Sequence, residues 1–156
     1  MLITILAVGI KMPNWVDEAF KDYSKRFGKE AKIALKEIKP EKRGAGVSAE
    51  QGIALEEARL RAAIPPNNLM VVLDERGQSL RSTQLAKLIE KWQFEGHNIC
   101  FIIGGADGLS QEFKSKADLL IKLSDLTLPH GMVRVLLIEQ LYRALSILQN
   151  HPYHRE

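Results

Sequence analysis

The chain has 156 residues, of which 46% are hydrophobic and 26% charged, and its formal net charge is +3. This length and composition predict a single globular domain over residues 1–156 and exclude a disordered chain. The small positive charge permits a polyanionic partner but does not require one.

The sequence gives no sign of a membrane or an export signal. No apolar run has the length of a membrane span, and the apolar start lacks basic residues and turns polar at Lys11. The one cysteine, Cys100, lies in a predicted buried strand and allows no intrachain disulfide. We therefore expect a cytoplasmic protein with no membrane association.

Short apolar runs alternate with apolar residues at helical spacing. In chain order they predict a strand over 2–8, a helix over 13–27, a half-exposed strand over 33–38, a helix over 48–64 opened by a capping box, a strand over 69–73, a helix over 82–96, a strand over 98–103, a short helix over 110–116, a strand over 119–123 and a helix over 130–149. This alternation predicts an α/β fold with a mainly parallel sheet and helices on both faces. We expect residues 74–77 to form a polar turn. Only about fifteen residues join the last two strands, which is near the minimum for a parallel crossover.

Residues 39–47 form a predicted loop with three basic side chains, Lys39, Lys42 and Arg43, and two glycines. Between Lys21 and Arg43 there are nine basic residues and four acidic ones. One interpretation is a solvated, mobile loop. The other is an arm that contacts phosphates and becomes ordered on RNA. The sequence leaves both open.

The predicted binding site lies where two neighbouring strands end. Glycines 104, 105 and 108 follow the strand over 98–103, and a loop of small and hydrogen-bonding residues over 123–130 follows the next strand. Glycines let a backbone approach a ligand closely. Ligands of open α/β sheets bind at the carboxyl ends of strands. We therefore place the site there, with Leu73 as an apolar wall.

Several familiar chemistries fit this region poorly. The glycine spacing is not that of a dinucleotide fingerprint and the helix after it is short, although Asp125 lies where a ribose-binding acid would, so a nucleotide-binding enzyme remains an alternative. The histidines 130, 151 and 154 lack the paired carboxylates or thiolates of a metal site, and we expect no metal. No serine lies in a nucleophile elbow. Asp74 and Glu75 are interpreted as ordinary turn residues. A cofactor that carries its own electrophile needs only a tight pocket of backbone groups and short side chains, which is what these loops offer.

A resemblance runs over the whole chain. It is carried by Ile102–Ser110, Leu123–His130, Arg134–Leu136, Glu139–Ala144, the ending Asn150–His154, the opening Val8-Gly9 with Lys11-Met12-Pro13, and the Lys42-Arg43-Gly44 loop. In order and spacing these motifs resemble the ribosomal RNA large subunit methyltransferase H family of the SPOUT class. The resemblance implies an α/β trefoil knot, in which the C-terminal chain threads a loop, and a homodimer that packs through the last helix.

The resemblance also implies a cofactor and a substrate. S-adenosylmethionine would sit bent in the knot, against Leu73, Gly104, Gly105, Leu123, Ser124, Asp125, Leu126, Thr127 and Leu128. The product would be pseudouridine 1915 methylated at N3, in helix 69 of 23S rRNA, made on assembled 70S ribosomes. An assembly factor that binds ribosomes without chemistry remains the other alternative.

The C-terminal tail, residues 150–156, and Arg143 in the helix before it provide the catalytic hypothesis. N3 of the base carries a proton that must leave before methyl transfer, and His154 titrates in a suitable range to accept it. Arg143 could stabilise charge on the uracil oxygens, and Tyr153 could stack on or hydrogen-bond the flipped base. In the alternative, the tail only closes the cofactor pocket or binds phosphate.

Overall fold

The computed structural model describes residues 1–44 and 46–154. Ala45, within the predicted loop 39–47, lies outside the described residues, as do Arg155 and Glu156. The sheet has five strands, all parallel, in the order β2-β1-β4-β3-β5. The strands are β1 (Leu2–Val8), β2 (Lys32–Ile38), β3 (Asn68–Ser79), β4 (Asn98–Ile103) and β5 (Leu119–Lys122). The five predicted strands and the parallel sheet are thereby confirmed.

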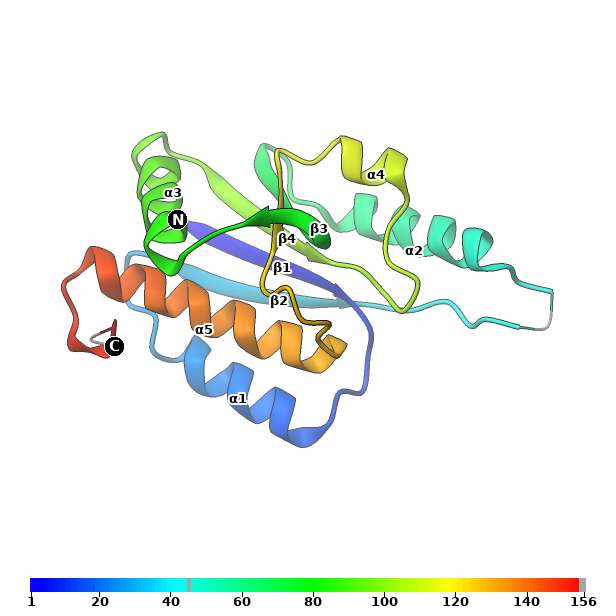
Figure 1. Cartoon of the computed structure of the whole chain (residues 1–156), viewed down its shortest axis with the longest axis horizontal. Coiled ribbons are helices and arrows are strands. Elements are labelled where there is room, and N and C mark those ends of the chain that lie inside the picture. The colour runs from blue at the N-terminus through cyan, green and yellow to red at the C-terminus, as the bar shows by residue number, and fades with distance from the viewer. Residues whose placement is uncertain (45, 155–156) are drawn as a thin grey trace.

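Helices cover both faces of the sheet (Figure 1). They are α1 (Asn14–Ser24), α2 (Ala49–Ala63), α3 (Ser82–Phe94), α4 (Gln111–Ser115), α5 (His130–Leu148) and the short 3-10 helix η1 (Pro152–His154). Alternate strand residues point to opposite faces, which gives two apolar cores. One core packs the sheet against α1, α3 and α5, and the other packs it against α2 and α4.

Two local predictions hold closely. Ser48 and Gln51 form the capping box that begins α2, because the Ser48 hydroxyl accepts from the Gln51 N–H and the Gln51 side chain accepts from the Ser48 N–H. β2 alternates exposed and half-buried residues and lies at one edge of the sheet, as its sequence pattern predicted.

The predicted polar turn over 74–77 is wrong, because β3 continues through it to Ser79. Leu73 and Gln78 are both opposite Ile121 of β5, so the residues between them bulge out of the strand. A Cβ on Gly77 would lie 2.5 Å from the carbonyl carbon of Ile121. A glycine therefore lets this bulge pass directly against the backbone of β5. Glu75 and Arg76 are exposed to solvent in the bulge. The sequence there is therefore polar, as it would be in a turn.

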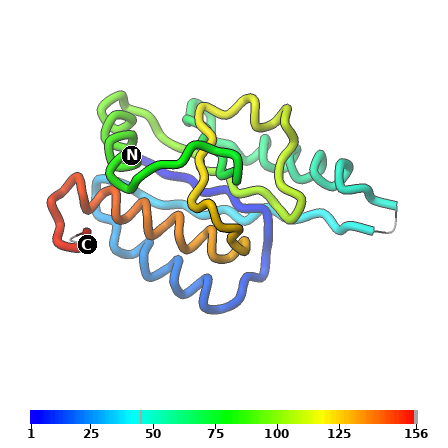
Figure 2. Tube along the Cα trace, in the orientation of Figure 1, coloured from blue at the N-terminus to red at the C-terminus, as the bar shows by residue number. Residues whose placement is uncertain are grey.

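The short connection between β4 and β5 passes over a third strand of the sheet. From β4 the chain passes through the five-residue α4 and enters β5, which pairs with β3 and not with β4 (Figure 2). The segment between β4 and β5 therefore crosses β3. After β5 the chain enters α5, which returns along the sheet to the end where both termini lie.

Candidate functional site

A cavity of about 970 Å³ opens at the carboxyl edge of the sheet. Its lining comes from the ends of β1, β3, β4 and β5 and from the loops that follow them. The size is that of a site for a cofactor or a drug-sized ligand. Its position is the one predicted from the sequence.

The structure brings the predicted cofactor residues together. Those that line the cavity are Leu73, Gly104, Gly105, Leu123, Ser124, Leu126, Thr127 and Leu128. Asp125 is the exception: its side chain is 82% exposed and pairs with Lys122. That ion pair holds the pKa of Asp125 below its ordinary value, so the carboxylate is charged and faces solvent.

The glycine-rich loop is compact. The Gly108 N–H donates to the Gly105 carbonyl over 3.0 Å, and Gly108 has a φ of 72° that favours glycine. A Cβ on Gly105 would lie 2.9 Å from Val8 Cγ1 and 3.0 Å from Glu56 Oε1. The loop thus needs glycine in order to fit between β1 and α2 while it lines the cavity.

A charged pair forms another part of the wall. Lys114 of α4 lies 2.7 Å from Asp74 Oδ2, and the two side chains are 15% and 11% exposed. Burial alone would raise the pKa of Asp74, but hydrogen bonds from Lys114 and the Arg76 N–H outweigh it and leave the pKa lowered. Asp74 is therefore an ionised, bonded group. Its pairing with a residue forty positions later gave no local signal in the sequence.

Sequence reasoning missed the role of His130, at the first turn of α5. His130 lines the cavity and hydrogen-bonds the backbone of Gly104, while its Nε2 accepts from Arg134 Nε over 3.0 Å. Burial lowers its pKa and the neighbouring guanidinium lowers it further. The ring is thus neutral at pH 7 and holds one orientation against the glycine-rich loop. Its i, i+4 spacing to Arg134 was the available signal.

Arg134 explains that orientation. Its side chain is 1% exposed, and its guanidinium donates to Glu37 Oε2 over 2.6 Å and to the Gly9 carbonyl over 2.9 Å. The arginine therefore ties α5 to the carboxyl ends of β1 and β2. A buried arginine persists only when its donors are paired in this way.

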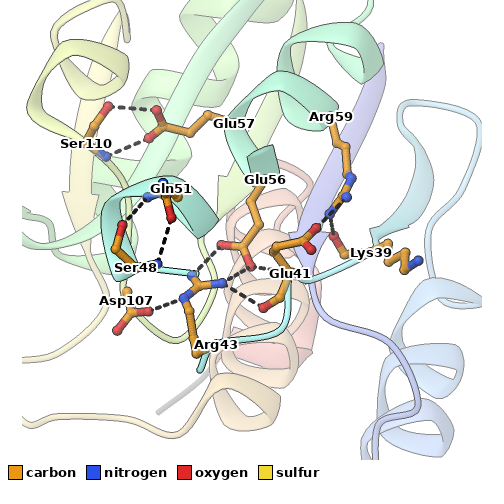
Figure 3. A network of polar contacts seen from close by, with 10 residues as sticks. All are labelled: Lys39, Glu41, Arg43, Ser48, Gln51, Glu56, Glu57, Arg59, Asp107 and Ser110. Atoms are coloured by element: carbon orange, nitrogen blue, oxygen red, sulfur yellow. Dashed lines mark hydrogen bonds and ion pairs between the residues drawn. The ribbon is translucent and has the colours of Figure 1, made fainter. Parts of the chain in front are cut away.

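The basic loop extends beyond the sheet after β2 (Figure 1), but side-chain hydrogen bonds tie its residues 39–43 to the rest of the protein. Arg43 points inward, toward Glu56 of α2 and Asp107 of the glycine-rich loop (Figure 3). Arg59 of α2 also donates to Glu41 and to the Lys39 carbonyl. Residues 39–43 therefore have specific contacts with α2 and the glycine-rich loop. Nothing in the sequence indicated that Arg43 pairs with a buried carboxylate.

The predicted catalytic residues lie at the other end of α5. Tyr153 donates from its hydroxyl to Glu139 Oε1 or Tyr23 Oη, each 3.0 Å away, and its ring lies under Arg143. Burial and these two neighbours raise the pKa of Tyr153. His154 Nδ1 lies 3.4 Å from Ser146 Oγ. Arg143 lies thirteen positions after His130 in α5, which is about 20 Å of helix. Within one chain, the structure does not bring the tail to the cavity.

The described residues offer little support for a metal site, a membrane span, a cysteine nucleophile or a dinucleotide-binding unit. Over residues 1–44 and 46–154, no three His, Cys, Asp or Glu side chains cluster as a metal site would require. In the same ranges no helix is long and apolar enough to cross a membrane. Burial raises the pKa of Cys100 to about 12, so this thiol is not a nucleophile. The helix after the glycines has five residues, too few for a dinucleotide-binding unit.

Comparison with known proteins gives consistent results. The family model described as predicted SPOUT methyltransferase matches residues 1–154. Proteins named ribosomal RNA large subunit methyltransferase H are 64% identical in Chromobacterium violaceum and 62% identical in Neisseria gonorrhoeae and Laribacter hongkongensis, over all of this chain and all of each relative.

Solved structures share the fold at low identity. A probable methylase family protein from Haemophilus influenzae superposes with a TM-score of 0.61 at 16% identity, over 97% of this chain and 69% of that one. A probable methyltransferase from Bordetella pertussis gives 0.56 at 15% identity, over 92% and 95%. The chain belongs to the SPOUT methyltransferase family and, within it, to the ribosomal RNA large subunit methyltransferase H proteins.

Proposed function

From this membership we propose that the protein transfers a methyl group from S-adenosylmethionine to ribosomal RNA of the large subunit, at N3 of pseudouridine 1915 in helix 69 of 23S rRNA. We place the reaction on assembled 70S ribosomes in the cytoplasm. The names of the relatives support the RNA class. The observation that carries the proposal is the cavity at the carboxyl edge of the sheet, which is built from the glycine-rich loop and residues 123–128.

The cavity fits such a cofactor in its size and in its chemistry. Apolar side chains of Leu73 and Leu123 offer contact surface, and the glycines 104 and 105 expose backbone groups without a Cβ in the way. S-adenosylmethionine supplies an activated methyl group, so the protein needs no nucleophile of its own. Its residues have to bind, orient and exclude water.

We further propose that the crossing of β3 by the segment before β5 belongs to a trefoil knot. The bulge of β3 and the tight passage of Gly77 against Ile121 support this. Knots are rare, and here Gly77 lets β3 pass beside the backbone of β5 with no side chain between them. A knot would fix residues 123–128 next to Gly104 without help from a ligand.

The proposed chemistry has two parts. At the cavity, neutral His130 holds the Gly104 backbone and Arg134 holds His130. At the tail, His154 would accept the N3 proton, Arg143 would stabilise charge on the uracil oxygens, and Tyr153 would stack on or hydrogen-bond the base. Because about 20 Å of α5 separates these parts, one chain does not supply both to one substrate.

A homodimer would solve this problem if the tail of one subunit reaches the cavity of its partner. Apolar side chains exposed near the cavity support a covered surface there: Ile10 and Leu126 line the cavity and are 43% and 77% exposed, and Trp15 of α1 is 50% exposed. Large apolar groups of this exposure are common at interfaces. A symmetric dimer would form two such composite sites.

RNA would be held mainly through phosphates. Lys42 is exposed at the end of the held segment 39–43, where a phosphate could reach it. A single small subunit offers little surface, so recognition would depend on the partner subunit and on the shape of the assembled ribosome.

The test is transfer of labelled methyl from S-adenosylmethionine to ribosomes that lack the modification, with 50S subunits alongside. We expect label on 70S and not on 50S, in the 23S RNA. Co-sedimentation with ribosomes without transfer would instead support the assembly-factor alternative. Normal turnover of both His154→Ala and Tyr153→Phe would refute the catalytic tail.

A further inference from the structure

Arg43 makes an unusual set of contacts for a residue in a basic surface loop. Its Nε donates to Asp107 Oδ2 over 2.6 Å, and its Nη1 donates to the Glu41 carbonyl over 2.7 Å. Its two terminal nitrogens lie 3.3 and 3.2 Å from the two oxygens of Glu56. The guanidinium thus bridges the loop, α2 and the glycine-rich loop (Figure 3).

The partner on α2 is buried. The Glu56 side chain is 3% exposed, and it also accepts from the Glu41 N–H over 2.8 Å. Its Oε1 is one of the atoms that a Cβ on Gly105 would meet. A carboxylate in this position requires cationic and N–H donors, so Arg43 is needed to satisfy it. This contrasts with exposed ion pairs, which contribute little.

Gly52 provides an independent observation. It lies inside α2, where glycine costs about 1 kcal/mol relative to alanine. A Cβ there would lie 2.3 Å from Arg43 Nη1 and 2.4 Å from its Cζ. The glycine therefore makes room for the guanidinium to lie on the helix. The helix thus carries an unfavourable residue at a position where the Arg43 guanidinium lies against it.

The two loops joined by Arg43 have different tasks. Residues 104–108 line the cavity, and residues 39–43 carry Lys42 toward the surface where the proposed RNA would lie. Glu41 and Arg43 also line the cavity. A change in the position of one loop is therefore transmitted to the other through a single planar side chain.

We propose that Arg43 is a positioning residue that couples the cofactor cavity to the RNA-facing segment 39–43. This rests on the proposed function, which assigns the ligands of the two loops. When Arg43 is in place, the glycine-rich loop holds the conformation that receives the cofactor, and bound cofactor in turn holds segment 39–43. Such coupling is reciprocal by thermodynamic necessity.

The first experiment measures cofactor affinity without RNA. The full-length protein is titrated with S-adenosylmethionine by calorimetry, as wild type and as Arg43→Ala, Gly52→Ala and Lys42→Ala. We expect the first two variants to bind about tenfold more weakly, within the usual range of coupling between sites. Lys42→Ala removes the same charge from the neighbouring, exposed position and should bind within about twofold of wild type.

Gly52→Ala separates positioning from charge. It leaves Arg43 intact and favours the helix, so the fold should be retained, but its Cβ displaces the guanidinium. Thermal unfolding of each variant identifies any general loss of structure. Arg43→Lys should recover little affinity, because an ammonium cannot contact Asp107 and both Glu56 oxygens in the same geometry.

The second experiment measures the reverse direction of the coupling. Trypsin can cut after Lys42 and Arg43, and both sites are present in wild type and in Gly52→Ala. Saturating cofactor should slow this cleavage in wild type and have little effect in Gly52→Ala. Wild-type affinity in both Arg43→Ala and Gly52→Ala, or protection that is equal in wild type and Gly52→Ala, would overturn the coupling. Failure of wild type itself to bind the cofactor would instead overturn the proposed function, and the coupling with it.

Discussion

The two ends of α5 are held in different ways. At the cavity end, Arg134 is buried and ties His130, Gly9 and Glu37 together through directional bonds. At the tail end, Tyr153 packs at the surface against the rings of Tyr23 and Tyr142. A buried charge network permits one arrangement only, whereas aromatic contacts at a surface can be exchanged for others.

This difference shows how ligand binding and contact with a partner or substrate can be divided between the two ends of α5. The rigid end suits a pocket that must be formed before its ligand arrives, and the surface-packed end suits a segment that engages a partner or a substrate. The two ends then act as half-sites joined by one helix. The predictions that follow alter one end at a time.

The largest expected effect comes from breaking the cavity end with Arg134→Met. The change leaves the Gly9 carbonyl and His130 Nε2 without their donor, and each stranded buried acceptor costs on the order of 1–3 kcal/mol. We expect a loss of about 3 kcal/mol in the free energy of unfolding, measured by urea denaturation. Arg26→Met, which removes the exposed ion pair with Asp22 and the cation–π contact with Tyr23 near the tail, is the control and should cost about 1 kcal/mol. Equal losses would remove the contrast between the ends.

Gly77→Ala should have the next largest effect, because the added Cβ meets the backbone of Ile121, which cannot turn aside. Overpacking of this kind costs about 1–3 kcal/mol. The matched control is Gly28→Ala, whose Cβ would meet only the end of the flexible Glu30 side chain. Both variants are compared with wild type by thermal unfolding, and an unchanged midpoint for Gly77→Ala would contradict the tight passage beside β5.

Tyr153→Phe is a smaller change, made at the tail end of α5. It keeps the ring contacts and removes the hydroxyl that bonds Glu139 and Tyr23, so the free energy of unfolding should fall by about 1 kcal/mol. Cofactor affinity, measured by calorimetry, should not change, because the hydroxyl lies far from the cavity. A marked loss of affinity in this variant would contradict this and show that the hydroxyl acts on a cofactor cavity, that of its own chain or that of the partner subunit.

The smallest expected effect is the pH dependence contributed by His130. Its pKa is lowered in the folded protein, so the unfolded chain takes up a proton at higher pH than the folded one does. This contribution to stability is complete above the ordinary histidine range and is lost as the pH falls through the lowered pKa. His130→Gln should therefore lose less stability than wild type between pH 7 and pH 5 in urea denaturation. A parallel decline of the two proteins would contradict the assignment.

Much of the fold could be predicted because it depends on local patterns. The five strands, the five helices and the capping box of Ser48 and Gln51 follow from apolar spacing and from residues close together in sequence. The bulge over 74–77 could not be predicted, since it is set by the passage of Gly77 beside Ile121, a contact between distant segments.

The position of the cavity was predictable for the same reason. Glycines 104 and 105 and residues 123–128 follow strands, and parallel strands end at one edge. Partners that meet only in the folded chain gave no signal: Arg43 with Glu56, Asp74 with Lys114, and Arg134 with Glu37. The separation of the tail from the cavity, in contrast, follows from the length of the predicted helix over 130–149 and could have been derived from the sequence.

The most direct test of the two half-sites is complementation between two inactive variants. Thr127→Trp fills the mouth of the cavity from an exposed position, and Tyr153→Ala with His154→Ala removes the tail groups. Each variant alone should fail to transfer labelled methyl to 70S ribosomes. After coexpression in equal amounts, half of the dimers are mixed and each contains one intact composite site, so we expect about a quarter of wild-type activity. No recovery in mixed dimers whose formation has been verified would show that the tail does not act on the partner's cavity.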